Sequence, residues 1–196
     1  MAIFAKAKTT TPPIPAGTFT ATCISVYDLG LQYNENYGNT SYKVQLTWEA
    51  YLPGEEKARL ASKEYTLSLN EKSGLYKDMM SWRAHGFTPE EMDTGFDVKA
   101  MLGKSCLLGI IHNEKGYHKI ASVMSLPVGM NPPARQNELS TFAFSSPDWL
   151  DKLPGWIKDK IKRSDTYQDK LESADVGTQV EKEADDLGLE DVEFPY

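Results

Sequence analysis

The sequence predicts a mainly β domain of the α+β class, and three observations support this. Three segments with strand character follow one another in the first part of the chain. A helical period then replaces the strand period between residues 71 and 103. Two further strand segments, joined by a short turn, come directly afterwards. The predicted element order is therefore three strands, a helical insertion and a two-strand hairpin.

The chain opens with a segment that cannot form a helix or a central strand. Residues 1–16 contain TTTPPIP, and each proline fixes φ and removes a backbone donor, so we expect an extended N-terminal arm. The stretch from residue 17 to 27 is rich in Thr, Val, Ile and aromatic residues and predicts the first strand. Its apolar parity changes midway, which indicates a bulge. Residues 28–39 read as a loop from their Gly and Asn content, and this loop carries Tyr33 and Tyr37.

The second strand, residues 41–51, has the clearest pattern. Polar and apolar residues alternate, as expected for a strand with one buried face. One face would carry Tyr42, Val44, Leu46 and Trp48, and the other Lys43, Gln45, Thr47 and Glu49. A Pro-Gly turn leads to a third strand over residues 59–69, the expected hairpin partner of the second.

Helical signals follow the third strand. Asn70 is placed to cap a helix over residues 71–85, with Gly86 as its end. The sequence from Thr88 to Glu91 fits a capping box for a second short helix. Asp97 is placed to open one further turn that ends at residue 103.

The last two strands complete a recognisable order. Residues 104–112 form a continuous apolar run, NEKG provides a turn, and residues 117–124 return as a fifth strand. This is the element order of the OB-fold, a five-stranded Greek-key barrel, which we place over residues 17–125 with its helical insertion between strands 3 and 4. Another small α+β sheet with the same element order is the alternative.

Three segments follow the predicted barrel. Prolines make residues 126–145 a linker, and residues 146–168 predict a short helical appendage. We expect Trp149 and Trp156 of this appendage to be buried on the barrel or on a partner. Residues 169–196 form a flexible acidic tail, in which 2 Lys and Arg face 10 Asp and Glu, a net charge of −8. Residues 1–168 hold 19 Lys and Arg against 18 Asp and Glu, a net charge of +1.

Composition favours a soluble protein of the cytoplasm that is not an enzyme. Cys23 and Cys106 lie in apolar strand segments and are expected to be free, buried thiols. The sequence lacks a secretory signal pattern and an apolar run of membrane-spanning length. The three histidines, of which His112 and His118 lie on the last hairpin, have no accompanying metal or nucleotide motif. We therefore expect no metal and no cofactor.

Basic residues alternate with aromatic ones on the predicted barrel, a mixture suited to single-stranded nucleic acid. Aromatic rings stack on exposed bases, and Lys or Arg neutralises phosphates. Tyr42 and Tyr65 share parity with core residues, so burial in the core is the alternative for both. The candidate nucleic-acid-binding residues are Tyr37, Tyr42, Lys43, Arg59, Lys63, Tyr65, Tyr117 and Lys119.

Most of residues 15–162 resembles the single-stranded DNA-binding proteins of tailed bacteriophages. The resemblance rests on PAGTFTATCISVYDLG, YKVQLTWE, EYTLSLNEKSGLYKDMMSWR, LLGKSCLLGIIHN, IASVMSLPVGM and SPDWLDKLPGWIKDKI. It implies a protein that coats exposed strands without sequence preference during phage DNA replication or recombination, in the host cell cytoplasm.

The last residues resemble the tip of bacterial single-stranded DNA-binding proteins, in which acidic residues precede an apolar residue, a proline and a terminal aromatic residue. Here the matching residues are Asp191, Phe194, Pro195 and Tyr196, and the sequence departs from the pattern in placing an aromatic residue before the proline and Tyr last. The resemblance implies a tail that competes with DNA for the barrel groove and recruits replication or recombination proteins.

A second reading is an OB-fold module that binds protein and modulates host replication, recombination or defence. The nearly neutral charge of residues 1–168 favours it, since many DNA-binding domains are overtly basic. The sequence leaves the oligomeric state open, with a homodimer as one alternative. It also leaves the choice between DNA and RNA open.

Overall fold

A computed structural model describes residues 12–35, 38–145 and 147–171. In chain order its elements are β1 (Gly17–Asn34), β2 (Asn39–Ala50), β3 (Arg59–Thr66), α1 (Gly74–Arg83), α2 (Pro89–Thr94), the 3-10 helix η1 (Val98–Met101), β4 (Ser105–His112), β5 (His118–Met124), β6 (Ser140–Phe142), the 3-10 helix η2 (Pro147–Lys152) and α3 (Gly155–Lys162). The chain is therefore mainly β with a few short helices, as the sequence predicts. Among the residues described, no helix has both the length and the apolar character needed to cross a membrane.

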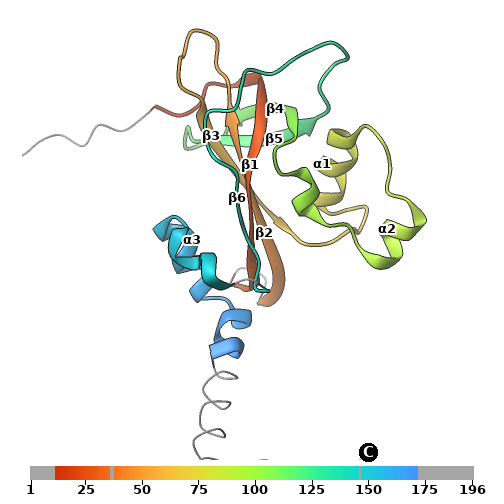
Figure 1. Cartoon of the computed structure of the whole chain (residues 1–196), viewed down its shortest axis with the longest axis vertical. Helices are drawn as coiled ribbons and strands as arrows, with labels where there is room; N and C mark the ends of the chain where they lie inside the picture. Colours follow the sequence, from red (N-terminus) through yellow and green to blue (C-terminus); the bar gives the residue numbers. More distant parts are fainter. Residues whose placement is uncertain (1–11, 36–37, 146, 172–196) are drawn as a thin grey trace, which may run out of the picture. The chain divides into compact units, whose positions relative to one another are not determined.

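One sheet contains all six strands. Its order is β3-β2-β1-β4-β5, and β6 pairs with β1 away from this path (Figure 1). β1 runs antiparallel to β4, with Phe19 opposite Leu108 and Ala21 opposite Cys106. β4 runs antiparallel to β5, and the register shifts between Gly109 and Ile110. A bulge there adds local twist to the hairpin.

The chain separates into two compact units. Of the described residues, those in the ranges 12–26 and 45–140 form unit 1, and those in the ranges 27–44 and 141–171 form unit 2. The long strands β1 and β2 each contribute residues to both units. Most of the region predicted as a loop and the predicted helical appendage thus belong to unit 2, whereas residues 126–140 of the predicted linker belong to unit 1.

Unit 1 has an apolar core between its strands and α1. Trp48 of β2 and Trp82 of α1 lie with ring centroids 5.7 Å apart, and Met79 of α1 is fully buried. α1 contacts β3 and β5. Cys23 and Cys106 are fully buried free thiols, as predicted, and burial raises the pKa of Cys23 to about 12. Both thiols are therefore core residues without an exposed thiolate.

The helical insertion is confirmed, but the caps of α1 differ from the prediction. Ser73, not Asn70, caps the helix by accepting a hydrogen bond from the Tyr76 amide. Asn70 instead accepts from the Lys72 amide, which makes it a turn residue that precedes the cap. The helix ends at Ala84 in the left-handed conformation rather than at Gly86.

The next two helical starts are confirmed. Thr88 and Glu91 form the predicted capping box, in which each side chain accepts from the other residue's backbone amide. Asp97 caps η1 by accepting from the Lys99 amide at 2.9 Å. These local signals were readable because each one depends only on residues three or fewer positions apart.

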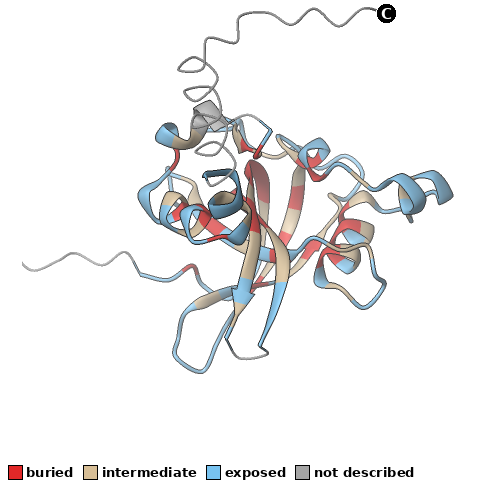
Figure 2. Cartoon of the chain, turned by 90° about the horizontal axis from the view of Figure 1, so that it is seen from below, coloured by how far each residue is buried: buried red, intermediate tan, exposed pale blue. Residues whose placement is uncertain are grey.

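Unit 2 has a separate apolar core. It consists of Tyr27, Leu29, Phe142, Phe144, Leu153, Ile157 and Ile161. α3 thus packs through Ile157 and Ile161 against residues of β1 and β6. Figure 2 shows the buried residues along the strands, whereas α2 has none.

The predicted loop over residues 28–39 is wrong, because β1 continues to Asn34 and β2 starts at Asn39. Gly30 has a φ of +70° and bends the strand without ending it. The Asp28 carboxylate accepts the Gly30 amide at 2.9 Å and holds this bend. β6 was not predicted either, since its three residues acquire strand geometry only by pairing with β1.

Candidate nucleic-acid interface

Tyr65 is a core residue, which corrects its prediction as a stacking side chain. It is only 4% exposed, and its hydroxyl donates to Asp78 Oδ2 at 2.7 Å. Lys63 Nζ lies 2.6 Å from the same oxygen and 5.1 Å from the Tyr65 ring. Burial and the Asp78 carboxylate raise the pKa of Tyr65, so the phenol stays protonated. Lys63 and Tyr65 therefore connect β3 to α1, and neither ring face of Tyr65 is open to a base.

Arg59 holds the N-terminal segment of unit 1. Its guanidinium donates to the Pro12 carbonyl and lies 3.2 Å from Glu55. His112 Nε2 lies 2.7 Å from the Ile14 carbonyl oxygen, and the Ile14 amide donates to His118 Nδ1 at 3.4 Å. The Ile14 side chain is 1% exposed. Residues 12–14, which we call the N-terminal strap, are thus fixed by side chains from β3, β4 and β5.

Tyr117 and Lys119 are the predicted residues that the structure does expose. Tyr117 is 66% exposed at the turn between β4 and β5, and Lys119 is exposed on β5. The Asn113 side chain accepts from the amides of Lys115 and Tyr117, and the Asn113 amide donates to the Tyr117 carbonyl. The backbone that presents this ring is therefore well ordered, which lowers the entropic cost of stacking.

Tyr42 and Lys43 lie in unit 2 on β2, and both are partly exposed. The Tyr42 hydroxyl donates to Asp28 Oδ2 at 3.1 Å. Burial, together with this carboxylate, raises the pKa of Tyr42 to about 12. Burial also raises the pKa of Asp28, although the hydrogen bonds from the Gly30 amide and Tyr42 act in the opposite direction. Tyr42 is thus held at its hydroxyl end, and only part of its ring is accessible.

Two exposed aromatic residues of unit 2 were absent from the predicted site. Trp156 on α3 is 57% exposed, so it is not buried against the described residues, and its burial on a partner stays a prediction. Tyr33 near the end of β1 is 62% exposed. Gln32 Nε2 donates to the Lys160 carbonyl at 3.0 Å, so the strand end that carries Tyr33 adjoins α3. Trp156 and Lys160 share a helix face at i, i+4 spacing. The helical period could have predicted the exposure of Trp156. Ile157 and Ile161 share one helix face, which is buried, and Trp156 does not lie on that face.

One strip of β2 in unit 1 is covered and cannot serve as an open binding face. Gln45, Thr47 and Glu49 are 3%, 8% and 0% exposed. Glu49 accepts from the backbone amides of Gln136 and Asn137, each at 2.9 Å, and from the Tyr51 hydroxyl at 2.6 Å. Burial alone would raise the pKa of Glu49, but these hydrogen bonds outweigh it and lower the pKa. Residues 136 and 137 of the predicted linker thus cover Glu49 in this strip.

The remaining predicted site residues cannot be placed. Outside the described residues lie Tyr37, Asp191, Phe194, Pro195 and Tyr196. The side chain of Trp149 is also outside the described part of the chain. Within the described ranges, no group of three or more His, Cys, Asp or Glu side chains could hold a metal ion.

The structure therefore gives two separate sets of exposed candidates. Unit 1 presents Tyr117 with Lys119, and unit 2 presents Tyr33 and Trp156 together with Lys162, the exposed lysine of α3. Comparisons of the chain with protein-family models, curated proteins and solved structures give no match.

Proposed function

We propose that the protein binds single-stranded DNA without sequence preference and is not an enzyme. The observation that carries this proposal is the exposure of three aromatic side chains, Tyr117, Trp156 and Tyr33. Tyr117 lies two residues before Lys119, and Trp156 lies on α3, which carries three lysines. A stacked base contributes about 1–3 kcal/mol, and every base has a face that can stack. Such a surface therefore favours unpaired strands over any particular sequence.

The strand arrangement supports an OB-fold for the sheet. In the order β3-β2-β1-β4-β5, the first strand lies between β2 and β4, as it does in a Greek-key barrel of this type. The two end strands, β3 and β5, contact each other, and α1 contacts both. A sheet whose two end strands contact each other can close into a barrel. The helix α1 follows β3 and precedes β4, as the predicted OB-fold requires.

The binding mode follows from the side chains. Lys119 on the β4–β5 hairpin, and Lys162 and Arg163 after Trp156, are exposed and can neutralise phosphates. The aromatic rings would take the bases. We further propose that the acidic segment with Asp191, Phe194, Pro195 and Tyr196 recruits replication or recombination proteins, in the phage context that the resemblance implies. Its charge of −8 over residues 169–196 supports an interaction role.

Titration of a fluorescently labelled dT oligomer with the full chain tests the proposal. We expect binding at low salt, with Trp156→Ala weakening the affinity about fivefold or more, since one stacked base is lost. Trp156→Phe is the matched control, because it keeps a stacking ring and should stay near the wild-type affinity. Parallel titrations with RNA of equal length and with duplex DNA show which of the three nucleic acids the protein binds most tightly.

The proposal fails if the full chain does not bind dT at low salt. It also fails in its present form if Trp156→Ala, Tyr33→Ala and Tyr117→Ala all bind as tightly as the wild type, because the exposed aromatic side chains would then be irrelevant to binding.

The second candidate function, a module that binds protein, is favoured by the near-neutral charge of residues 1–168. Absence of dT binding would support that candidate.

A further inference from the structure

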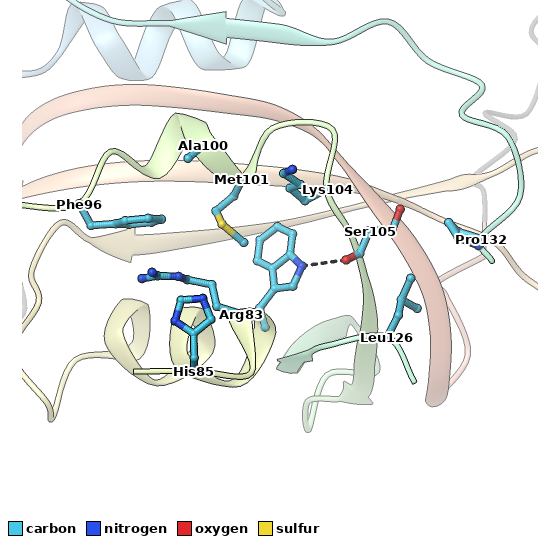
Figure 3. A pocket seen from close by; sticks show the side chains of 10 residues that line it. Arg83, His85, Phe96, Ala100, Met101, Lys104, Ser105, Leu126 and Pro132 are labelled. Carbon is cyan, nitrogen blue, oxygen red and sulfur yellow. Dashed lines mark hydrogen bonds between the residues drawn. The ribbon is translucent and has the colours of Figure 1, made fainter. Parts of the chain in front are cut away.

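A groove beside α1 in unit 1 lies outside the surfaces proposed for DNA. It has two hollows that share His85, one of about 550 Å³ and one of about 490 Å³. We call them together the α1 groove. The larger hollow lies between the end of α1, η1 and the segment after β5, and Figure 3 shows Arg83 and His85 on one side of it and Leu126 and Pro132 on another. The smaller hollow is lined by α1 itself, including Tyr76, Lys77 and Met80.

Apolar and aromatic side chains form much of the larger hollow. Trp82 is held by its indole nitrogen, which donates to the Ser105 carbonyl at 2.9 Å. The Arg83 guanidinium lies 4.6 Å from the Phe96 ring centroid and 4.8 Å from that of Phe87. Such stacking fixes a cation beside an apolar surface. Met101 adds an adaptable side chain to the same wall.

The groove carries positive charge and no acid. Lys77, Arg83 and Lys104 line its two hollows, and neither hollow is lined by Asp or Glu. Arg83 Nη2 pairs with Glu91 at 2.6 Å, but Arg83 Nη1 is buried and has no hydrogen-bond partner among the described residues. A buried guanidinium nitrogen without an acceptor is costly. The groove thus fits an aromatic or apolar group that arrives next to carboxylates.

We propose that the α1 groove binds the segment from Glu190 to Tyr196 of the same chain. This segment supplies the complementary chemistry: Glu190, Asp191 and Glu193 are acidic, and Phe194 and Tyr196 flank a proline. In an extended chain these two rings are about 7 Å apart along the backbone, so adjacent hollows can each take one. The proline restricts the segment to an extended form and reduces the entropy lost on binding.

The tether between the described chain and the bound segment is long compared with a small domain. The 18 residues from 172 to 189 can span roughly 60–65 Å, against about 30 Å for the diameter of a small domain. Binding within one chain also benefits from an effective concentration on the order of millimolar. The proposal does not rest on DNA binding. Ser105 at the groove begins β4, whereas Tyr117 lies in the turn beyond the other end of this strand, about 25 Å away along the strand.

Nuclear magnetic resonance of the full chain tests the proposal. We expect the Trp82 indole and Met101 methyl signals to differ between the wild type and the double variant Phe194→Ala/Tyr196→Ala. A synthetic peptide with the sequence from Glu190 to Tyr196, added to the double variant, should move both signals back toward their wild-type positions. The difference should persist on dilution, because the contact is within one chain.

Charge variants of the double variant provide the matched control. Lys104→Glu should weaken peptide binding roughly two- to fivefold, the effect of one exposed ion pair. Lys99→Glu makes the same charge change on η1, at an exposed position that does not line the groove, and should leave the affinity unchanged.

Four outcomes would overturn the proposal. The first is an absence of any difference at Trp82 and Met101, and the second is an equal effect of the two charge variants. The third is loss of the difference on dilution, which would assign the contact to a second copy. The fourth is movement of the same two signals by a dT oligomer in the double variant, which would make the groove a nucleic-acid site. Failure of dT binding alone leaves the proposal intact.

Discussion

Single side chains decide which candidate residues remain in the proposed interface. The sequence offers Lys63 and Tyr65 as a basic and aromatic pair, but Asp78 of α1 accepts hydrogen bonds from both, so they stabilise the fold. A strand pattern assigns a side chain to a face but does not show what covers that face. Trp156 illustrates the reverse case, because the structure leaves this side chain 57% exposed and accessible to a base or to a partner.

Gly30 lies at a point where the core of unit 2 leaves no room for a side chain. Its φ is +70°, and a Cβ atom there would come within 2.9 Å of Phe144 and of Ser164 Oγ. We expect Gly30→Ala to lower the free energy of unfolding by about 2–5 kcal/mol through backbone strain and overpacking. Gly38→Ala is the control, since Gly38 has a φ of +59° with no atom within 4 Å of the added Cβ.

Urea unfolding of the two glycine variants measures this difference. The left-handed backbone is common to both positions, so the control should show only the smaller strain cost of about 1–2 kcal/mol. Equal loss of stability in the two variants would show that the contacts with Phe144 and Ser164 are unimportant.

At the scale of elements, the sequence predicts most strands and helices correctly. β2, β4 and β5 agree within a few residues, because their apolar periods and turns are local signals. β1 does not agree, since its extension to Asn34 depends on partners in β2 and β6 that are distant in sequence. The sequence predicts only that the N-terminal segment is extended. It does not predict the contacts of the N-terminal strap, because they come from side chains on three strands that are distant in sequence.

The N-terminal strap gives a prediction about pH. His118 accepts the Ile14 amide, so it must be unprotonated at Nδ1 for this hydrogen bond. Burial and the neighbouring Arg59 and His112 lower the pKa of His118. The unfolded chain therefore binds a proton more readily than the folded chain. Stability from this contact is fully present above the ordinary histidine value of about 6.5 and is lost as the pH falls from there through the lower pKa of the folded chain.

Hydrogen exchange of the Ile14 amide at pH 7.5 and at pH 5.5 checks this expectation. Exchange should be more protected at pH 7.5 in the wild type, after correction for the intrinsic rate. In His118→Gln, whose side-chain oxygen can accept at both pH values, the corrected protection should change less. An identical pH dependence in the two proteins would contradict the role of His118.

At the scale of the whole molecule, the charge of the chain is unevenly distributed, because residues 169–196 carry a net charge of −8. Residues 1–168 carry a net charge of +1, so any affinity for DNA must come from local groups of basic and aromatic side chains rather than from an overall positive field. The division into two units was not predictable, because residues 27–44 join the C-terminal segment through the packing of Tyr27 and Leu29 with α3.

The salt dependence of dT binding tests the central claim most directly, because it measures whether phosphates are neutralised. For single strands, the logarithm of the affinity falls with the logarithm of the salt concentration by about 0.7 for each phosphate contacted. We predict a slope of about −2 or steeper for the full chain, which corresponds to roughly three or more phosphates. Binding that does not change with salt, or no binding even at low salt, would contradict the account.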